Sequence, residues 1–221
     1  MSDHVARKSH VYEQTARVAK ALANGKRLEL IDLLSQAERT VEGLARAAGL
    51  GITTASAHLQ SLKHGGLVAT RRDGTRVYYR LASDEVAGLY ARMRAVATGH
   101  LPDVAAATAA FLGEPTEQVD RAELVRRVEA GEVTVLDVRP REEYEAGHIP
   151  GAVSIPLDEL ADRLAELPDG LDVVAYCRGA YCVMAPEAVR LLVRRGRRAQ
   201  RLSTGMLEWR LDGRPVETIA A

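Results

Sequence analysis

The chain of 221 residues is long enough for one large domain or two ordinary ones, each with its own buried core. Hydrophobic residues make up 47% and charged residues 27%, which is ordinary for a soluble globular protein. The N-terminal residues are polar, and no apolar run approaches the ~18 residues of a membrane span, so we expect no membrane partner. Two cysteines cannot form a disulfide scaffold, so we expect a protein of the reducing cytoplasm.

The net charge of zero is unevenly divided along the chain. Residues 1–98 contain 15 Lys and Arg against 9 Asp and Glu, whereas residues 99–221 contain 15 Arg, no Lys and 21 acidic residues. This asymmetry indicates two domains with different partners, and the basic half meets the electrostatic condition for binding nucleic acid. Chance at surface positions would produce the same asymmetry, so charge alone does not decide between the two explanations.

A change of composition marks a boundary between the two halves. The stretch GHLPDVAAATAAFLGEPTEQ surrounds an alanine-rich, uncharged core with prolines and glycines. Asp103 is expected to cap a short helix that ends near Gly113. We therefore predict a domain at residues 1–98, a helical connector at 99–117 and a second domain at 118–221.

Helices are predicted through most of the first half. Apolar residues recur at helical spacing from His10 to Ala23 and from Lys26 to Gln36. In RTVEGLARAAGLGITTASAHLQSLKHGGLV, Thr40 is expected to cap a short helix, and Thr53 is expected to cap a second helix after a glycine turn. This arrangement predicts a helix-turn-helix, whose second helix can enter the major groove of DNA.

The predicted second helix contains no acidic residue, and its polar face consists of short side chains that suit base edges and phosphates. The stretch after it, VATRRDGTRVYYRL, predicts a hairpin that turns at Asp73-Gly74 with arginines near its tip. The residues predicted to contact DNA are Thr53, Thr54, Ser56, His58, Gln60 and Lys63 in the helix and Arg71, Arg72 and Arg76 in the hairpin.

The stretch AHLQSLKHGGLVATRRDGTRVYYRL resembles the winged-helix repressors of the arsenic-repressor (ArsR) type, over about residues 10–98. The resemblance implies a homodimer that binds double-stranded operator DNA, with the first helix and the helix around Glu85–Ala97 at the dimer interface. Members of this family often sense metals through cysteines at the start of the helix before the turn. This chain has ERTVEGLA there, with Thr40 in place of a cysteine, so we predict no metal and no cofactor.

The second half alternates strands and helices. Buried strands are predicted at Val133–Val138, Val153–Ile155 and Leu171–Tyr176, and a helix is predicted at Ala185–Arg195. Such alternation predicts an α/β domain with a parallel sheet, in which ligands bind at the carboxyl ends of the strands.

Both cysteines lie in the stretch CRGAYC, between the last of these strands and the helix. We expect the loop N–H groups, the helix N-terminus and Arg178 to lower the pKa of Cys177 and favour its nucleophilic thiolate. The alternative is that Cys177 is a small buried hydrophobic residue. Cys182 is either a resolving thiol that forms a disulfide or polysulfide bridge with Cys177 or a residue that fills the first turn of the helix.

Three motifs in order, LDVRPREEYEAGHIPGA, YCRGAYC and GMLEW, resemble the rhodanese family over about residues 118–221. The resemblance implies that Cys177 takes sulfane sulfur from thiosulfate, a persulfide or a polysulfide and carries it as a persulfide. It also implies that Asp137 braces the loop and that Arg139 attracts anionic donors together with Arg178. The residues implied to cradle the sulfur are Arg178, Gly179, Ala180 and Tyr181.

The loop departs from related families at two positions. Cys182 occupies the sixth position of the loop, where a common rhodanese loop has an arginine, which puts efficient use of thiosulfate in doubt. Cysteine phosphatases need an arginine six residues after the cysteine, where this chain has Val183, so phosphatase chemistry is disfavoured.

The sequence thus predicts a helix-rich winged helix-turn-helix domain followed by an α/β rhodanese domain. The predicted function is that of a homodimeric, cytoplasmic DNA-binding regulator that senses or transfers sulfane sulfur through a Cys177 persulfide. The alternatives are a sulfurtransferase enzyme whose N-terminal domain mainly dimerises it and a thiol-dependent oxyanion reductase, such as an arsenate reductase. The basic hairpin and the acid-free helix favour regulation.

Overall fold

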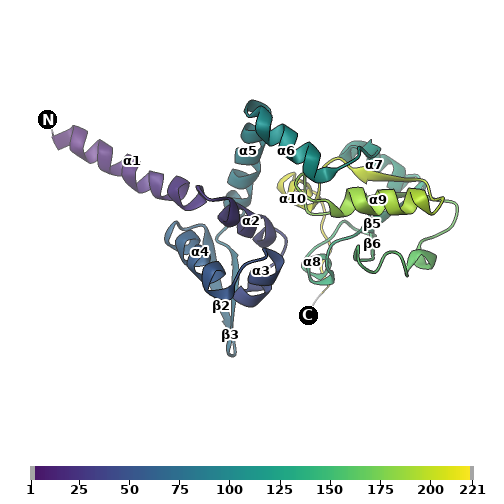
Figure 1. Cartoon of the computed structure of the whole chain (residues 1–221), viewed down its shortest axis with the longest axis horizontal. Coiled ribbons are helices and arrows are strands. Elements are labelled where there is room, and N and C mark those ends of the chain that lie inside the picture. The colour runs from purple at the N-terminus through teal and green to yellow at the C-terminus, as the bar shows by residue number, and fades with distance from the viewer. Residues whose placement is uncertain (1–2, 220–221) are drawn as a thin grey trace. The chain divides into compact units, whose positions relative to one another are not determined.

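The computed structural model describes residues 3–219 and is shown in Figure 1. The contacts between residues divide the chain into two compact units, Met1–Tyr90 and Ala91–Ala221. This boundary falls inside one continuous helix, α5 (Asp84–His100), rather than at the connector that composition indicates. The division into functional domains at residues 98 and 118 stays a prediction.

The first unit combines helices with a small antiparallel sheet, in the strand order β1-β3-β2. Its core consists of buried aliphatic residues from the helices, among them Leu30, Ile31, Leu44, Leu59 and Leu62. The elements before α5 are α1 (Asp3–Leu22), α2 (Gly25–Leu34), β1 (Arg39–Thr40), α3 (Val41–Ala47), α4 (Ile52–His64), β2 (Val68–Asp73) and β3 (Arg76–Leu81).

Two of the predicted helix caps can be tested directly. Thr40 does cap α3, because its hydroxyl accepts a hydrogen bond from the N–H of Gly43 at 3.3 Å. Thr53 does not cap α4, because the helix already begins at Ile52, and the carbonyl of Gly51 accepts the first helical hydrogen bond. A glycine can take this capping position without a side-chain partner, and Thr53 becomes part of the first turn.

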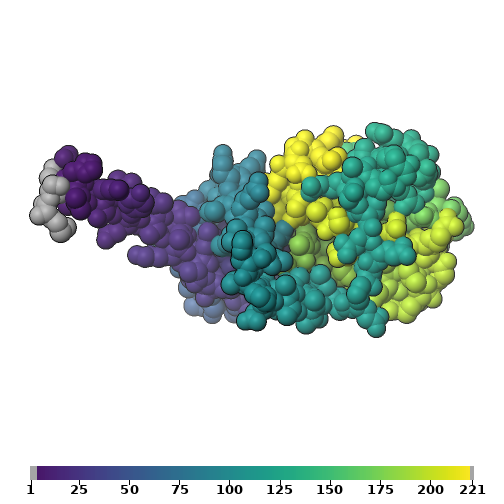
Figure 2. Space-filling model, turned by 90° about the horizontal axis from the view of Figure 1, so that it is seen from above, coloured from purple at the N-terminus to yellow at the C-terminus, as the bar shows by residue number. Residues whose placement is uncertain are grey.

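Helix α1 begins earlier than predicted and is mostly exposed. Figure 2 shows its N-terminal part, in dark purple, projecting away from the remainder of the first unit. Apolar side chains such as Val11 and Tyr12 are exposed on it, at 63% and 66%. A helix with exposed large apolar residues is typical of a surface that another molecule covers.

The second unit is built on a five-stranded, fully parallel sheet in the order β4-β8-β7-β5-β6. The predicted α/β class and parallel sheet are confirmed. After the end of α5, the elements are α6 (Pro102–Leu112), β4 (Gln118–Val119), α7 (Arg121–Glu129), β5 (Val133–Asp137), α8 (Arg141–Glu145), β6 (Val153–Ser154), the short 3-10 helix η1 (Leu164–Glu166), β7 (Asp172–Tyr176), α9 (Met184–Arg194), β8 (Ala199–Leu202) and α10 (Met206–Leu211).

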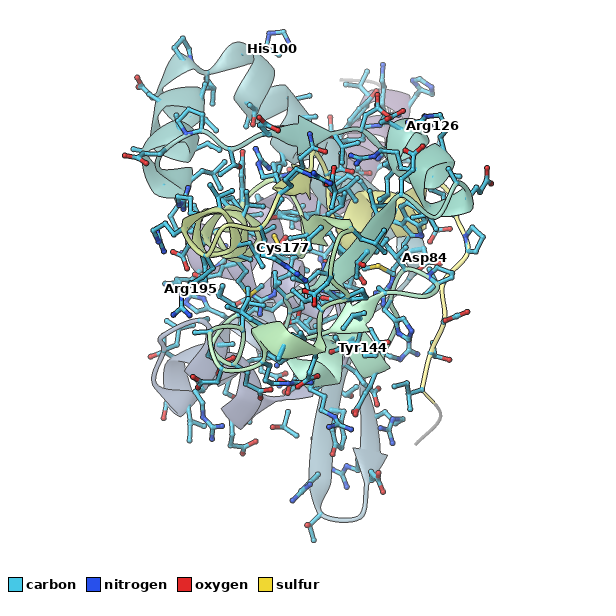
Figure 3. The ribbon with its side chains drawn as sticks, turned by 90° about the vertical axis from the view of Figure 1, so that its right-hand side faces the viewer. Asp84, His100, Arg126, Tyr144, Cys177 and Arg195 are labelled. Atoms are coloured by element: carbon cyan, nitrogen blue, oxygen red, sulfur yellow. The ribbon has the colours of Figure 1, made fainter. Side chains whose placement is uncertain are left out.

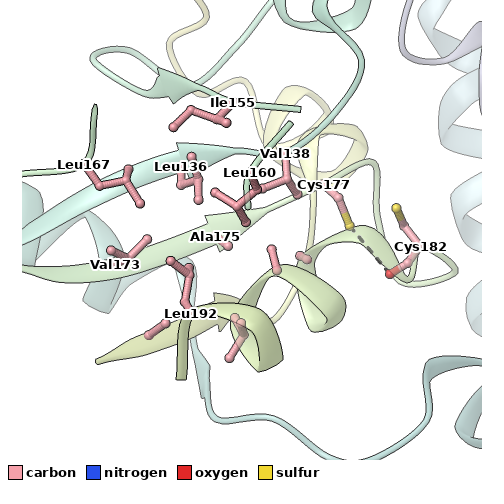
Figure 4. Close-up of a cluster of buried hydrophobic side chains, with 14 residues drawn as sticks. Leu136, Val138, Ile155, Leu160, Leu167, Val173, Ala175, Cys177, Cys182 and Leu192 are labelled. Carbon is pink, nitrogen blue, oxygen red and sulfur yellow. Dashed lines mark hydrogen bonds between the residues drawn. The ribbon is translucent and has the colours of Figure 1, made fainter. Parts of the chain in front are cut away.

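The sheet buries both of its faces, because successive residues of a strand point to opposite sides. On one face, Ala175 and Cys177 join a cluster that includes Leu192 of α9. On the other face, Tyr176 joins a cluster that includes Trp209 of α10. The cysteines therefore belong to the face that α9 covers (Figure 4).

The start of α6 differs from the prediction. Leu101 is its N-cap and Pro102 occupies the first turn, so Asp103 lies inside the helix rather than capping it. Proline is well suited to this place, because its missing N–H would have no helical partner there. The helix ends at Gly113 as expected, with a φ of 73° that favours glycine.

Among the helices of residues 3–219, none combines the length and the apolar character needed to cross a bilayer.

Candidate functional site

The two cysteines meet in the loop between β7 and α9. Cys177 directly follows β7, and α9 begins two residues after Cys182. Both side chains are buried, with only 3% of Cys177 and 7% of Cys182 exposed, and neither forms a disulfide. Figure 3 labels Cys177 among the side chains of the whole chain, and Figure 4 shows the side chains of the two cysteines next to each other. The Cys177 thiol donates a hydrogen bond to the carbonyl oxygen of Cys182 at 3.6 Å.

Backbone N–H groups converge on both sulfur atoms. The N–H groups of Gly179 and Ala185 interact with Cys177, and those of Arg178 and Met184 interact with Cys182. Met184 and Ala185 are the first residues of α9, so the positive end of a helix dipole lies beside the pair. The other two residues of the loop, Ala180 and Tyr181, are half-buried.

The pKa values of the two cysteines are shifted in opposite directions. Burial raises the pKa of Cys177 well above its usual value, and hydrogen bonding to Cys182 adds to the rise. Hydrogen bonding to the Cys177 side chain lowers the pKa of Cys182, and backbone N–H groups lower it further. The expected lowering of the Cys177 pKa is therefore not found in the resting loop, where the lowered pKa belongs to Cys182.

Arg178 does not face the sulfur atoms as a free cation. Its guanidinium donates to both carboxylate oxygens of Glu143, at 2.6 to 2.9 Å, and the Glu143 side chain is fully buried. This paired geometry anchors the loop to α8. The role of Arg178 in attracting anionic donors stays a prediction, and the Glu143 carboxylate balances part of the charge on which that role depends.

Arg139 is likewise unable to meet a donor from solvent, because its side chain is fully buried. It donates to the Asp137 carboxylate at 2.6 Å and to the carbonyl of Gly147 at 2.8 Å. Asp137 also accepts from the Tyr176 hydroxyl at 2.5 Å, and Tyr176 directly precedes Cys177. Asp137 thus supports the strand end that precedes Cys177, and Arg139 is a structural partner of Asp137.

The GMLEW motif supports the loop from the opposite side. The N–H of Met206 donates to the carbonyl of Cys177 at 2.9 Å, and that of Leu207 donates to the carbonyl of Arg178 at 3.1 Å. A Cβ atom on Gly205 would overlap the backbone of Gly179, so the loop packs directly against a glycine. The third motif therefore has a steric function in shaping the cysteine loop.

A cation that the sequence reasoning missed lies on the cysteine face of the sheet. Arg201 of β8 pairs with Ala175 of β7, and Ala175 shares its face with Cys177. Within residues 3–219, the Nε of Arg201 is buried without a hydrogen-bond partner. Burial lowers the pKa of Arg201, and an electrostatic interaction with Cys177 opposes this lowering. The two side chains therefore interact electrostatically. No motif marked Arg201, since β8 is short and mixed in polarity.

The predicted DNA-contacting side of α4 is accessible. Thr53, Thr54, Gln60 and Lys63 are exposed, while Ser56 and His58 are half-exposed. The opposite side of the helix is anchored in the core through residues such as Leu59 and Leu62. Gln60 donates to the Tyr79 hydroxyl at 3.2 Å and Lys63 donates to Thr70 at 3.1 Å, so both side chains are oriented by the sheet.

The hairpin formed by β2 and β3 carries its three arginines on exposed positions. Arg71 forms an ion pair with Glu38 and lies over the ring of Tyr78 at 4.8 Å. Arg72 and Arg76 are exposed near the turn, where a phosphate backbone can reach them. Arg71 is therefore the least available of the three for DNA.

Comparisons with known proteins agree with both halves of this description. Residues 22–71 match a helix-turn-helix domain family, and residues 120–212 match the rhodanese-like domain family. The chain is 61% identical over 217 residues to the HTH-type transcriptional regulator Rv0324 of Mycobacterium tuberculosis, covering 98% of this chain and 96% of that protein. It is 30% identical over 101 residues to a sulfurtransferase of Allochromatium vinosum, covering 45% of this chain and 92% of that protein.

A similar solved structure is the homodimeric winged helix-turn-helix DNA-binding domain of Mb0332 from Mycobacterium bovis. It is 56% identical, covers 46% of this chain and 91% of that chain, and has a TM-score of 0.42.

The first half of the chain is a helix-turn-helix with a basic hairpin, and the second half is a parallel sheet with a paired-cysteine loop. Together they define a transcriptional regulator that carries a rhodanese domain. The chain belongs to the family of HTH-type transcriptional regulators that includes Rv0324.

Proposed function

We propose that the protein is a sulfane-sulfur sensor of the cytoplasm, in which the paired cysteines set the affinity of a homodimer for operator DNA. The observation that carries this proposal is the pair itself. The chain contains two cysteines, and both lie in one strand-to-helix loop, where backbone N–H groups of the loop and of α9 interact with the side chains. The DNA-binding half contains no cysteine with which to sense a metal or an oxidant.

The chemistry begins with transfer of the Cys177 proton to the Cys182 thiolate, as the Cys177 sulfur attacks the donor. For a hydropersulfide donor, Cys177–SH, Cys182–S⁻ and RS–SH give Cys177–S–SH, Cys182–SH and RS⁻. Cys182 then attacks the inner sulfur of the persulfide, which forms the Cys177–Cys182 disulfide and releases hydrogen sulfide. Cys182 thus acts first as the base and then as the resolving thiol.

Arg201 is the residue that we expect to attract an anionic donor. Support comes from its place on the same sheet face as Cys177 and from its buried Nε without a partner among residues 3–219. The two arginines that the sequence favoured for this role are instead paired with Glu143 and Asp137. Thiosulfate and deprotonated persulfides are the anionic donors in question.

Homodimerisation and DNA binding belong to the same proposal. Exposed apolar residues on α1 and α5, among them Tyr12 at 66% and Val96 at 60%, suit an interface with a second copy of the chain. A two-fold dimer would present two copies of α4 to half-sites about 10 base pairs apart or a multiple of that spacing.

The decisive experiment combines intact-mass spectrometry with operator binding before and after inorganic polysulfide. The wild type is compared with Cys177→Ser and Cys182→Ser on DNA from the protein's own promoter. We expect only the wild type to change affinity, by roughly 5- to 150-fold. A response kept in Cys182→Ser and lost in Cys177→Ser would make the persulfide itself the signal.

Equal binding by all three proteins under both conditions would contradict the sensor proposal and favour a sulfurtransferase whose first half dimerises it. The similarity to the Allochromatium vinosum sulfurtransferase supports that second candidate. Arsenate reduction by the cysteine pair is the third candidate, and Val183 in place of an arginine disfavours it.

A further inference from the structure

The cysteine loop is held against helix α5 by a group of side chains within the second unit. The Tyr181 hydroxyl and the Thr98 hydroxyl are hydrogen-bonded at 2.9 Å. The guanidinium of Arg94 lies 5.2 Å from the centre of the Tyr181 ring and forms an ion pair with Glu208 of α10. We call Arg94, Thr98, Tyr181 and Glu208 the loop clamp.

The clamp is tightly packed, which makes it sensitive to the position of the loop. Only 8% of Arg94 is exposed. A Cβ atom placed on Gly179 would lie 3.2 Å from Glu208 and 3.3 Å from Arg94, so both side chains press against the loop backbone. Glu208 also accepts a hydrogen bond from the N–H of Gly205 at 2.9 Å. A shift of the loop therefore cannot leave these contacts intact.

Formation of a Cys177–Cys182 bridge brings the two sulfur atoms closer together. Two thiols in non-bonded contact are farther apart than the roughly 2 Å of an S–S bond. Tyr181 is the immediate neighbour of Cys182, so any movement of the Cys182 backbone toward Cys177 also moves the backbone that carries the Tyr181 ring. The site is buried and closely packed, and the displacement must therefore be taken up by the loop.

The clamp residues of helix α5 lie on one side of the helix. Arg94 and Thr98 are four residues apart and share one face of the helix. Earlier residues of the same continuous helix, among them Val86 and Tyr90, are buried and belong to the first unit.

We propose that the loop clamp reports the sulfur state of the cysteine pair to α5. The clamp is closed while both thiols are free, and it opens when the Cys177–Cys182 bridge withdraws Tyr181 from Arg94 and Thr98. Arg94 and Thr98 are positioning residues, since neither touches a reacting sulfur. The bridge chemistry rests on the function proposed above, whereas the clamp itself is testable without it.

The first test measures alkylation of the cysteines in the full-length, unmodified protein by iodoacetamide, followed by intact mass. Both sulfurs are buried, so the reaction needs opening of the loop, which the clamp opposes. We expect Arg94→Gln to raise the rate by about fivefold and Thr98→Val by about twofold. Arg94→Lys, which keeps the charge opposite Glu208, should return the rate most of the way to wild type.

Arg92→Gln is the matched control, because Arg92 is an exposed residue of the same helix and the variant loses the same charge. Its rate should equal that of the wild type. An unchanged rate in both Arg94→Gln and Thr98→Val would overturn the clamp, and so would an equal acceleration in Arg92→Gln.

The second test follows amide hydrogen exchange of residues 94–100 in the wild type before and after inorganic polysulfide. Exchange should rise once mass spectrometry detects the bridge. Unchanged exchange in the bridged protein would refute the reporting role. Cysteines that stay unmodified would count against the proposed function, and the alkylation rates would still decide whether the clamp holds the loop.

Discussion

Replacing Gly205 by alanine tests whether the glycine shapes the cysteine loop. The added Cβ would overlap the backbone nitrogen of Gly179 and lie 2.5 Å from the carbonyl carbon of Arg178, where ordinary contacts are 3.4 to 4 Å. Gly205 has a φ of −143°, which any residue can adopt, so the effect of the substitution is purely steric. The loop must retreat by about an ångström, because its backbone has no rotamer with which to avoid the methyl group.

The magnitude follows from two contributions. Overpacking of a well-packed interior costs about 1–3 kcal/mol. The retreat also strains the hydrogen bonds from Met206 to Cys177 and from Leu207 to Arg178, each worth about 1 kcal/mol. We therefore expect the second unit to lose about 2–3 kcal/mol of unfolding free energy, together with slower persulfide formation at Cys177.

Urea unfolding followed by tryptophan fluorescence is the appropriate assay. Trp209 is the single tryptophan of the chain, is 4% exposed and lies in α10 next to Gly205, so its signal reports on the second unit. Gly99→Ala is the matched control, since a Cβ there meets nothing within 4 Å. The steric reasoning is refuted if Gly205→Ala unfolds within about 0.5 kcal/mol of the wild type, the range of a neutral surface change.

Three further results are expected. Arg201→Gln should slow sulfur transfer from thiosulfate by about tenfold and leave transfer from an uncharged trisulfide unchanged. Equal slowing with both donors would contradict the electrostatic role of Arg201. Alkylation of the wild-type pair should begin below the usual pKa of a thiol, because hydrogen bonding to Cys177 lowers the pKa of Cys182. Cys182→Ser leaves only Cys177, whose pKa is still raised by burial although the raising effect of Cys182 is gone, so its alkylation should need a higher pH than that of the wild-type pair; identical profiles would contradict the coupling of the two thiols. Arg72→Ala should weaken binding to all DNA sequences alike and reduce the slope of log affinity against log salt concentration by about 1. Gln60→Ala should instead relax the sequence preference. The reverse pattern would exchange the roles of the two residues.

The sequence predicts the architecture well because both units carry strong local signals. Turn glycines, a threonine cap and apolar spacing outline the helix-turn-helix, and buried strands outline the parallel sheet. The strand β8 escapes such reasoning, since AQRL is short and has polar residues at its two central positions. Arg201 was missed with it, because its place beside Cys177 depends on strand order, which no local pattern encodes.

Charges within the site were harder to interpret than the fold. A sequence shows that Arg139 and Arg178 lie near the motif, but it does not show which carboxylates they meet. In the structure Asp137 and Glu143 are both fully buried and take up these cations. The distribution of the proton between Cys177 and Cys182 depends on the depth of burial, which a loop motif does not specify.

The burial of the cysteine pair also determines how the site survives peroxide. Thiols are oxidised beyond the sulfenic acid in proportion to their thiolate character and their exposure. Here the pKa of Cys182 is lowered, but only 7% of its side chain is exposed, and Cys177 lies beside it. Condensation of a sulfenic acid at Cys182 with the Cys177 thiol would give a disulfide and water. Burial and the neighbouring thiol thus both oppose oxidation of the pair to the irreversible sulfinic and sulfonic acids.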